Sequence, residues 1–389
     1  MFAVFHNARK RARMLLPCIL ALGLAACDIA QSPLSGGGNF QGEPVPVALL
    51  VPSGLGEGTN ELLAQSLENA ARLAMRDLNG VQIDLRVYQT AGDAALAGAN
   101  ASKAVDEGAE IIIGPVFAAA ANAAGTAVAD RGISVLSFSN NSAIAGGNLF
   151  VLGPTFQNTA DRMASYAAAQ GKLRVVTVYS EDVAGTQGRD AIQRAVAANG
   201  MSVVGTVGYA LSQQDVINAI PQVTSLVNQT GADALFFTTD TATALPLLSQ
   251  LLPEAGITSE VAQFIGLTRW DIPAQTLTLP GVQNGWFAIP DPGSTAAFSD
   301  QYQQAYGTAP HPIGGLAFDA IAAIGALKSQ GSALSPASLT QGAGYRGASG
   351  IFRLNPNGTN TRGLAVATIS DAQVQILSPA PQRFGGAGF

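Results

Sequence analysis

The stretch that decides the fold is Gly108-Ala-Glu-Ile-Ile-Ile-Gly-Pro115, a short apolar run between two alanine-rich segments. The spacing of apolar residues predicts a helix near 94–106 and another at 118–129. A continuous apolar strand between helices is typical of a parallel strand that is buried on both faces of its sheet. Similar short apolar runs occur at 45–51, 133–138, 174–179 and 234–238, so the sequence predicts an α/β fold of doubly wound parallel sheets.

The alternation restarts after Gly153-Pro154, which divides the chain into two βα units of similar size. Two further helices are predicted around 296–306 and 315–328. The segments 352–354, 364–369 and 374–377 then predict a short antiparallel meander, with a turn at Asn355–Gly358. Two successive units without a short repeat indicate two lobes that face a cleft.

The first 26 residues have the pattern of a bacterial lipoprotein signal. Arg9, Lys10, Arg11 and Arg13 precede an apolar run that is too short to span a bilayer as a helix. The run ends in Leu24-Ala-Ala-Cys27, so we expect residues 1–26 to be removed and Cys27 to carry lipid. Residues 27–44 are rich in Gly, Ser, Pro and Gln, which predicts a flexible tether.

Removing this signal restricts the chemistry that the mature chain can support. It leaves 16 basic and 26 acidic residues, a formal charge of −10, which argues against a nucleic-acid partner. Cys18 and Cys27 belong to the signal and the anchor, so neither a disulfide nor a thiolate metal site is expected. His311 is the one remaining histidine, and it lies between two prolines. No nucleophile, phosphate-binding or zinc motif is present, so we predict no catalytic residues, no metal site, no cofactor and no enzyme activity.

Binding is the function that these exclusions leave. Ligands of open α/β sheets gather at the carboxyl ends of the strands. Polar or aromatic side chains that could meet a ligand follow several predicted strands: Ser53, Phe117, Ser139, Asn140, Asn141, Tyr179, Thr239, Arg269 and Trp270. Arg269 could hold a carboxylate or phosphate, and Trp270 could cover an apolar or sugar face. Glu181-Asp182 could instead form a carboxylate pair, although a solvated loop explains these residues better.

At these positions the chain resembles the leucine-binding branch of type I periplasmic binding proteins. The similar segments are Val47-Ala-Leu-Leu-Val-Pro-Ser53, Gly108–Pro115, Gly132-Ile-Ser-Val-Leu-Ser137, Gly231-Ala-Asp-Ala-Leu-Phe-Phe237 and Gly347–Gly363. The resemblance implies three crossings between the lobes, near Gly153, Pro290 and Gly347. Lobe 1 would then comprise 45–153 and about 290–346, and lobe 2 would comprise 154–289 and about 347–379, before a tail at 380–389.

The residues that contact the amino-acid ligand in that branch are replaced in this chain. Phe117-Ala-Ala119 stands where the family has a small hydroxyl residue. Thr268-Arg269 stands near the position where the family has the acidic residue that meets the ammonium group of the ligand. Replacing an anion by a cation would reverse selectivity at that point. With these departures and the lipidation motif at Leu24–Cys27, the chain is most similar to the penicillin-binding-protein activator branch. Members of that branch are lipoproteins that stimulate a peptidoglycan synthase.

Two functional hypotheses follow from this resemblance. The first is a non-catalytic activator that contacts a peptidoglycan synthase. The alternative is a lipid-anchored substrate-binding protein of an ABC transporter for an amino acid or other small solute, with an ABC permease as its partner and a small polar ligand in the cleft. Both place the protein in the periplasm, anchored to a membrane. Asp28 after the lipidated cysteine resembles an inner-membrane retention signal.

Overall fold

The computed structural model describes residues 43–56, 58–239 and 241–385. The predicted signal, Cys27, Asp28 and most of the tether lie outside this range. Within the described part, no helix is both long and apolar enough to cross a membrane.

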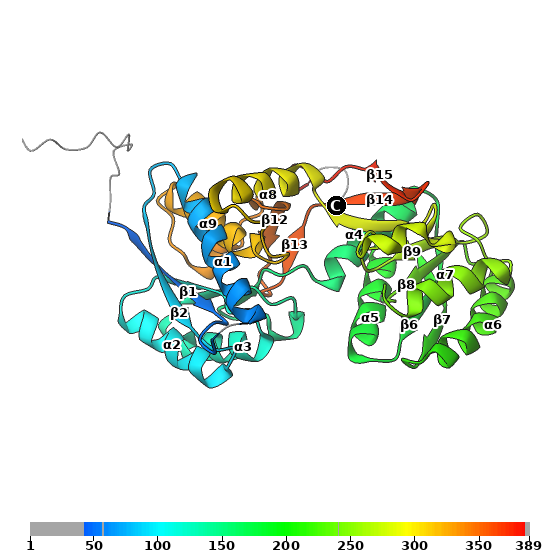
Figure 1. The fold of residues 1–389 in the computed structure, drawn as a ribbon, viewed down its shortest axis with the longest axis horizontal. Helices are drawn as coiled ribbons and strands as arrows, with labels where there is room; N and C mark the ends of the chain where they lie inside the picture. Colours follow the sequence, from blue (N-terminus) through cyan, green and yellow to red (C-terminus); the bar gives the residue numbers. More distant parts are fainter. Residues whose placement is uncertain (1–42, 57, 240, 386–389) are drawn as a thin grey trace, which may run out of the picture. The chain divides into compact units, whose positions relative to one another are not determined.

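The first lobe is built on a parallel sheet of five strands in the order β2-β1-β3-β4-β5. Figure 1 shows β1 and β2 of this sheet side by side. Val47 of β1 pairs in register with Ile111 of β3, so the apolar run that predicted the fold forms the central strand of this sheet. The strands are β1 (Val45–Val51), β2 (Ile83–Gln89), β3 (Ile111–Ile113), β4 (Ser134–Ser137) and β5 (Leu149–Val151).

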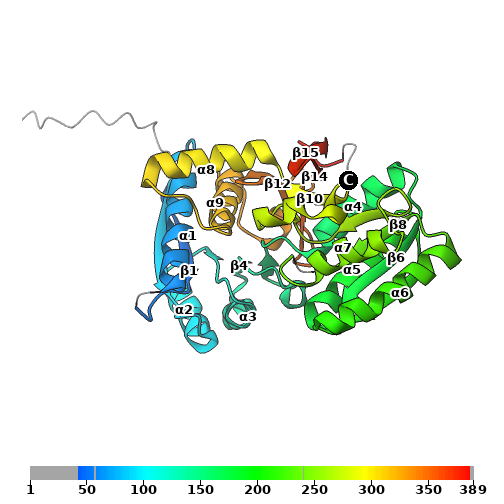
Figure 2. The same ribbon diagram turned by 45° about the vertical axis from the view of Figure 1, so that its right-hand side comes forward.

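Helices cover both faces of this sheet because β1 is apolar on both sides. Val47 and Leu49 pack in one core with α1, α8 and α9, whereas Ala48 and Leu50 pack in another with α2 and α3. Figure 2 shows α8 and α9 beside α1. The helices are α1 (Thr59–Arg76), α2 (Ala94–Asp106), α3 (Ala118–Ala127), α8 (Pro292–Tyr306), α9 (Gly315–Lys328) and the short α10 (Pro336–Leu339).

The second lobe contains a sheet of seven strands in the order β15-β14-β10-β9-β8-β6-β7. Strands β10, β9, β8, β6 and β7 are parallel, and β14 and β15 add an antiparallel edge. The strands are β6 (Arg174–Ser180), β7 (Ser202–Tyr209), β8 (Ala234–Phe237), β9 (Gln263–Gly266), β10 (Trp286–Pro290), β14 (Leu364–Ser370) and β15 (Gln373–Ser378).

This sheet is also covered on both faces. Val176 and Val178 of β6 pack with α6 and α7, whereas Val175 packs with α4 and α5. The helices are α4 (Phe156–Ala169), α5 (Val183–Ala198), α6 (Gln213–Thr230) and α7 (Ala244–Glu254). The two sheets confirm the predicted α/β class with doubly wound parallel sheets.

The closing β section is divided between the lobes and does not form one meander. A small antiparallel sheet contains β11 (Tyr345–Gly347), β12 (Gly350–Leu354) and β13 (Asn360–Arg362). Phe352 and Leu354 of β12 pack in the core of the first lobe, whereas Leu364 of β14 packs in the second. The third crossing therefore lies at Gly363 and not near Gly347, because the apolar side chains of β12 complete the core around α9.

Candidate functional site

The segments that join the lobes meet at a buried polar cluster centred on Arg362. Its Nε donates to the carbonyl of Leu152 at 3.2 Å, and Nη1 donates to the hydroxyl of Ser349 at 3.2 Å. Its Nη2 lies 2.9 Å from Oδ2 of Asp319 on α9, and the two side chains are 5% and 1% exposed. The backbone carbonyl of Ser349 accepts the backbone N–H of Asp291, the residue after β10. One guanidinium therefore connects all three crossings.

Asn360 and Gly153 complete this junction. The side-chain amide of Asn360 donates to the carbonyls of Val151 and Gly153, at 2.8 and 2.9 Å. The backbone carbonyl of Asn360 accepts from the side-chain amide of Asn158 in α4. A side chain on Gly153 would stand only 2.6 Å from the carbonyl of Ser139. The first crossing can therefore lie against the loop after β4 only because residue 153 is glycine.

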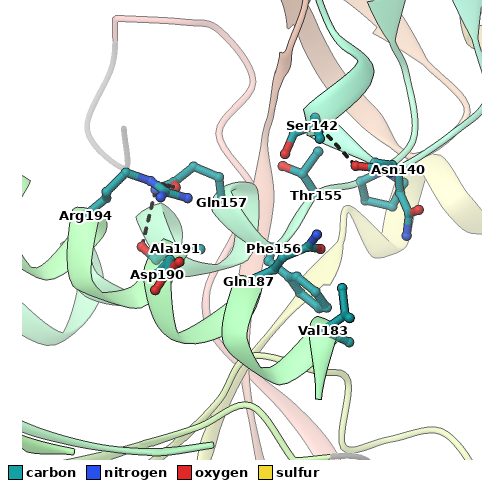
Figure 3. Close-up of a pocket in the computed structure, with 14 residues that line it drawn as sticks. Asn140, Ser142, Thr155, Phe156, Gln157, Val183, Gln187, Asp190, Ala191 and Arg194 are labelled. Atoms are coloured by element: carbon teal, nitrogen blue, oxygen red, sulfur yellow. Dashed lines mark hydrogen bonds between the residues drawn. The ribbon is translucent and has the colours of Figure 1, made fainter. Parts of the chain in front are cut away.

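A cavity of about 500 Å³, here called the α5 cavity, lies beside the first crossing. The loop after β4 contributes Asn140–Ala143, the crossing contributes Pro154–Gln157, and the remaining lining comes from one face of α5 (Figure 3). That face carries Val183, Ala184, Gln187, Asp190, Ala191 and Arg194.

The α5 cavity offers hydrogen-bonding groups and both signs of charge. Nε of Arg194 donates to Oε1 of Gln157 at 2.9 Å, and its guanidinium forms no ion pair within the described part of the chain. Asp190 accepts from Nη2 of Arg189 at 2.7 Å, and the amides of Asn140 and Gln187 supply donors and acceptors. A guanidinium and a carboxylate with several amides suit a small polar solute that carries its own charges.

A second cavity, of about 340 Å³, lies on the other side of Pro154 and is here called the proline cavity. It is mainly apolar, with Pro154, Pro290, Phe298 and Leu316 among its lining residues. Arg269 also lines it. Nε of Arg269 donates to Oδ1 of Asp271 at 2.9 Å, and its Nη2 pairs with Oδ2 of the same residue.

The Arg269–Asp271 pair corrects the expected reversal of charge near Thr268-Arg269. The two side chains neutralise one another, and Asp271 is only 14% exposed. An acidic group is therefore still present beside the cation, two residues further along the chain.

Trp270 and Thr239 do not lie where the sequence analysis expected them. Trp270 is 1% exposed and packs in the second core, with its ring 6.2 Å from that of Phe287. Gly266 and Gly285 make room for the indole. Thr239 is fully buried. Trp270 cannot cover a ligand from this position, because the absence of side chains at Gly266 and Gly285 lets the indole pack inside the core.

The other predicted residues lie at the ends of their strands but outside both cavities. Ser53 and Ser139 are buried, and the Ser139 hydroxyl accepts the backbone N–H of Asn141. Phe117 is 40% exposed at the start of α3. The guanidinium carbon of Arg189 lies 5.0 Å from the centroid of the Tyr179 ring. Their roles as ligand contacts stay predictions, whereas Asn140 and Asn141 line the α5 cavity.

Two further groups from the sequence analysis have structural roles. Asp182 caps α5 by accepting the backbone N–H of Gly185 at 2.7 Å. His311 lines the proline cavity, and its Nδ1 accepts the backbone N–H of Ile313 at 3.3 Å. No group of three or more His, Cys, Asp or Glu residues among the described positions could hold a metal ion.

The sequence analysis missed the polar residues that α5 contributes. Gln187, Asp190 and Arg194 lie on one face of the helix, at the spacing that brings successive turns together. That spacing is visible in the sequence. A polar helical stripe usually faces solvent, however, so only the loop of Asn140 opposite it distinguishes this one.

The match to known proteins covers nearly all of this architecture. A family model described as periplasmic binding protein matches residues 44–373, which include the first lobe, all three crossings and the second lobe up to the start of β15. The chain belongs to the periplasmic binding protein family. This membership implies a periplasmic location and a family role in binding solutes.

Solved structures share the fold at low sequence identity. A Rhodospirillum rubrum protein assigned to branched-chain amino acid ABC transport is 17% identical with a TM-score of 0.72, covering 86% of this chain and 100% of that one. A branched-chain amino acid ABC transporter ligand-binding protein of Burkholderia xenovorans is 18% identical with a TM-score of 0.66, covering 88% and 97%. An ABC transporter substrate-binding protein of Desulfitobacterium hafniense in complex with Leu is 19% identical with a TM-score of 0.60, covering 86% and 100%. A search of curated protein sequences found no match.

Proposed function

We propose that this protein is the solute receptor of an ABC importer and that it binds a small charged solute, such as an amino acid, in the α5 cavity. The family match across residues 44–373 carries the proposal, because the matching architecture includes both lobes and the junction between them. The branched-chain amino acid transport proteins that share the fold support it further.

The lining of the α5 cavity favours a zwitterionic solute over a neutral one. Arg194 would meet a carboxylate, and Asp190 would meet an ammonium group, while amides from both lobes would bond the remaining polar atoms. Charged hydrogen bonds of this kind contribute about 1.5–3 kcal/mol each, so one truncation would weaken binding roughly tenfold or more.

Thermal unfolding of the purified protein in the presence of single metabolites tests this proposal. A solute at one hundred times its Kd would stabilise the protein by about 2.7 kcal/mol. Titration calorimetry of Arg194→Ala and Asp190→Ala would then show weaker binding, whereas the control Arg72→Ala, on the surface of α1, would bind as the parent does. A library of amino acids and small organic acids without any stabilising member would contradict the proposal.

The lipid anchor at Cys27 is part of the same proposal. An anchored receptor stays beside its permease, and three acyl chains would hold it firmly to the membrane. Replacing Cys27 with Ser should move the protein from the membrane fraction to the soluble periplasmic fraction. Fractionation of inner from outer membranes would test the retention signal predicted at Asp28.

The activator hypothesis remains a prediction, and the family match favours the importer over it. It would gain support if the pure protein raised the activity of a peptidoglycan synthase and no metabolite bound. Genes for a permease and an ATPase beside this one would favour the receptor.

A further inference from the structure

A third cavity, of about 320 Å³, carries an excess of positive charge and is here called the arginine cavity. It is enclosed by α4, the end of α5 and strands β12 and β13. Three arginines line it: Arg162, Arg353 and Arg362. Arg362 is neutralised by Asp319, so the charge that matters is that of the other two.

Arg162 is a buried cation without a carboxylate partner. The residue is 6% exposed, its Nε donates to the carbonyl of Leu364 at 2.7 Å, and its Nη2 donates to the hydroxyl of Ser378 at 2.7 Å. Among the described residues, no acidic side chain lies within ion-pair distance of it. Burial lowers the pKa of Arg162, which agrees with an uncompensated guanidinium.

Arg353 of β12 adds a second cation that forms no ion pair with the described residues. Its guanidinium carbon lies 4.7 Å from the centroid of the Phe384 ring, a cation–π contact that offsets part of the charge but supplies no hydrogen-bond acceptor and no counter-ion. Its Nε is buried and has no hydrogen-bond partner among the described atoms. A buried donor left in this state costs about 1–3 kcal/mol, so a ligand that accepts from it would be favoured.

One carboxylate also lines the arginine cavity. Asp161 accepts from the side-chain amide of Gln157 at 2.7 Å, and burial raises the pKa of this carboxyl. This carboxylate opposes an anion, and the hydrogen bond from Gln157 and the attraction of Arg194 offset part of its charge. Arg162 and Arg353, which form no ion pair with the described residues, outnumber it.

We propose that the arginine cavity binds a small oxyanion, either a tetrahedral one such as phosphate or sulfate or the carboxylate of an organic acid, between Arg162 and Arg353. This site is separate from the α5 cavity. Its walls come from α4 and α5 of the second lobe and from β12 and β13, which pack with the first. An occupying anion would therefore bond to both sides of the third crossing.

Calorimetric titration of the full chain with sodium sulfate, sodium phosphate and sodium succinate, each against sodium chloride at equal ionic strength, tests the site. Saturable binding of any of the three anions supports the proposal, and the arm that binds tells a tetrahedral anion from a carboxylate. Arg353→Gln should weaken that binding at least tenfold, since one charged hydrogen bond is lost.

Arg346→Gln is the matched control. Arg346 lies on the neighbouring strand β11, where its Nη1 donates to Gln382 at 3.3 Å, and it lies outside the arginine cavity. Its variant should bind the anion as the parent does. Arg162→Gln should also lose binding, and if that variant fails to fold, the result with Arg353→Gln decides. No difference among the four salts, or affinity within twofold of the parent in Arg353→Gln, would overturn the proposal. A solute of the α5 cavity should still bind the Arg353 variant, so the two sites are tested separately.

Discussion

Replacing Arg362 by methionine should destabilise the protein severely, because Asp319 would lose its counter-ion. Methionine keeps much of the aliphatic volume of arginine but none of its donors. The Asp319 carboxylate would remain 1% exposed, with the backbone N–H of Ala348 at 2.7 Å as the donor left to it. Removal of one partner from a buried ion pair costs about 3–5 kcal/mol. The carbonyl of Leu152 would lose its donor as well.

A paired substitution separates the ion pair from the rest of the junction. Arg362→Met with Asp319→Leu removes both charges, and such replacements are often neutral or stabilising relative to the buried pair. The double variant should therefore be more stable than Arg362→Met alone, by about 2 kcal/mol or more. Asp319→Leu alone should fall between the parent and Arg362→Met, because Arg362 keeps Leu152 and Ser349 as acceptors.

Urea unfolding followed by tryptophan fluorescence measures these differences. Trp270 and Trp286 both lie in the second lobe and report its loss of packing. The reasoning fails if Arg362→Met unfolds within 1 kcal/mol of the parent, or if the effects of the two single changes simply add in the double variant.

Three further predictions concern the stability of the two lobes. Burial raises the pKa of Tyr345 to about 12, and its hydroxyl donates to the carbonyl of Leu339 at 2.9 Å. Because the unfolded residue ionises near pH 10, the stability that neutral Tyr345 contributes should be lost between about pH 10 and pH 12, and urea unfolding of Tyr345→Phe should show a smaller loss over that window. Gly185→Ala should lower the free energy of unfolding by about 1–3 kcal/mol, because the new methyl would overlap Ser180. Gly293→Ala in α8, where a methyl meets no atom within 4 Å, should change it by well under 1 kcal/mol. Equal urea midpoints for the two variants would contradict the packing argument. Trp270→Leu should lower the free energy of unfolding by about 2–4 kcal/mol, because the indole is buried in the core. Its affinity for the solute of the α5 cavity, measured by calorimetry, should equal that of the parent. A loss of affinity without a loss of stability would show instead that Trp270 contacts the solute.

Elements with a strong periodic pattern could be predicted from the sequence. The predicted helix at 315–328 has the same bounds as α9, and the predicted strand at 174–179 differs from β6 by one residue. The short strands β5 and β10 were missed, because three and five residues are too few to show a distinctive alternation. The assignment of β12 to the first lobe depends on Phe352 reaching the core of α9, which no local pattern reveals.

The candidate site was less predictable than the fold, for the same reason. Loops at strand ends could be located, and Asn140 and Asn141 do line a cavity. Whether a side chain such as that of Trp270 turns outward or inward depends on the space left by Gly266 and Gly285. Arg162 has no sequence signal as a buried cation, since its burial results from packing against β14 and the end of β15.

The division of the closing strands between the lobes has a consequence for synthesis and export. The first core needs residues of β1 together with Phe352, and the second needs residues of β6 together with Val366. Neither core is a contiguous piece of the chain, so a polypeptide that emerges amino terminus first cannot complete either one until its last strands follow. Such long-range closure slows folding. If the chain crosses the membrane unfolded, as the signal predicted at residues 1–26 implies, the order of its strands delays the native state until most of the chain has been exported.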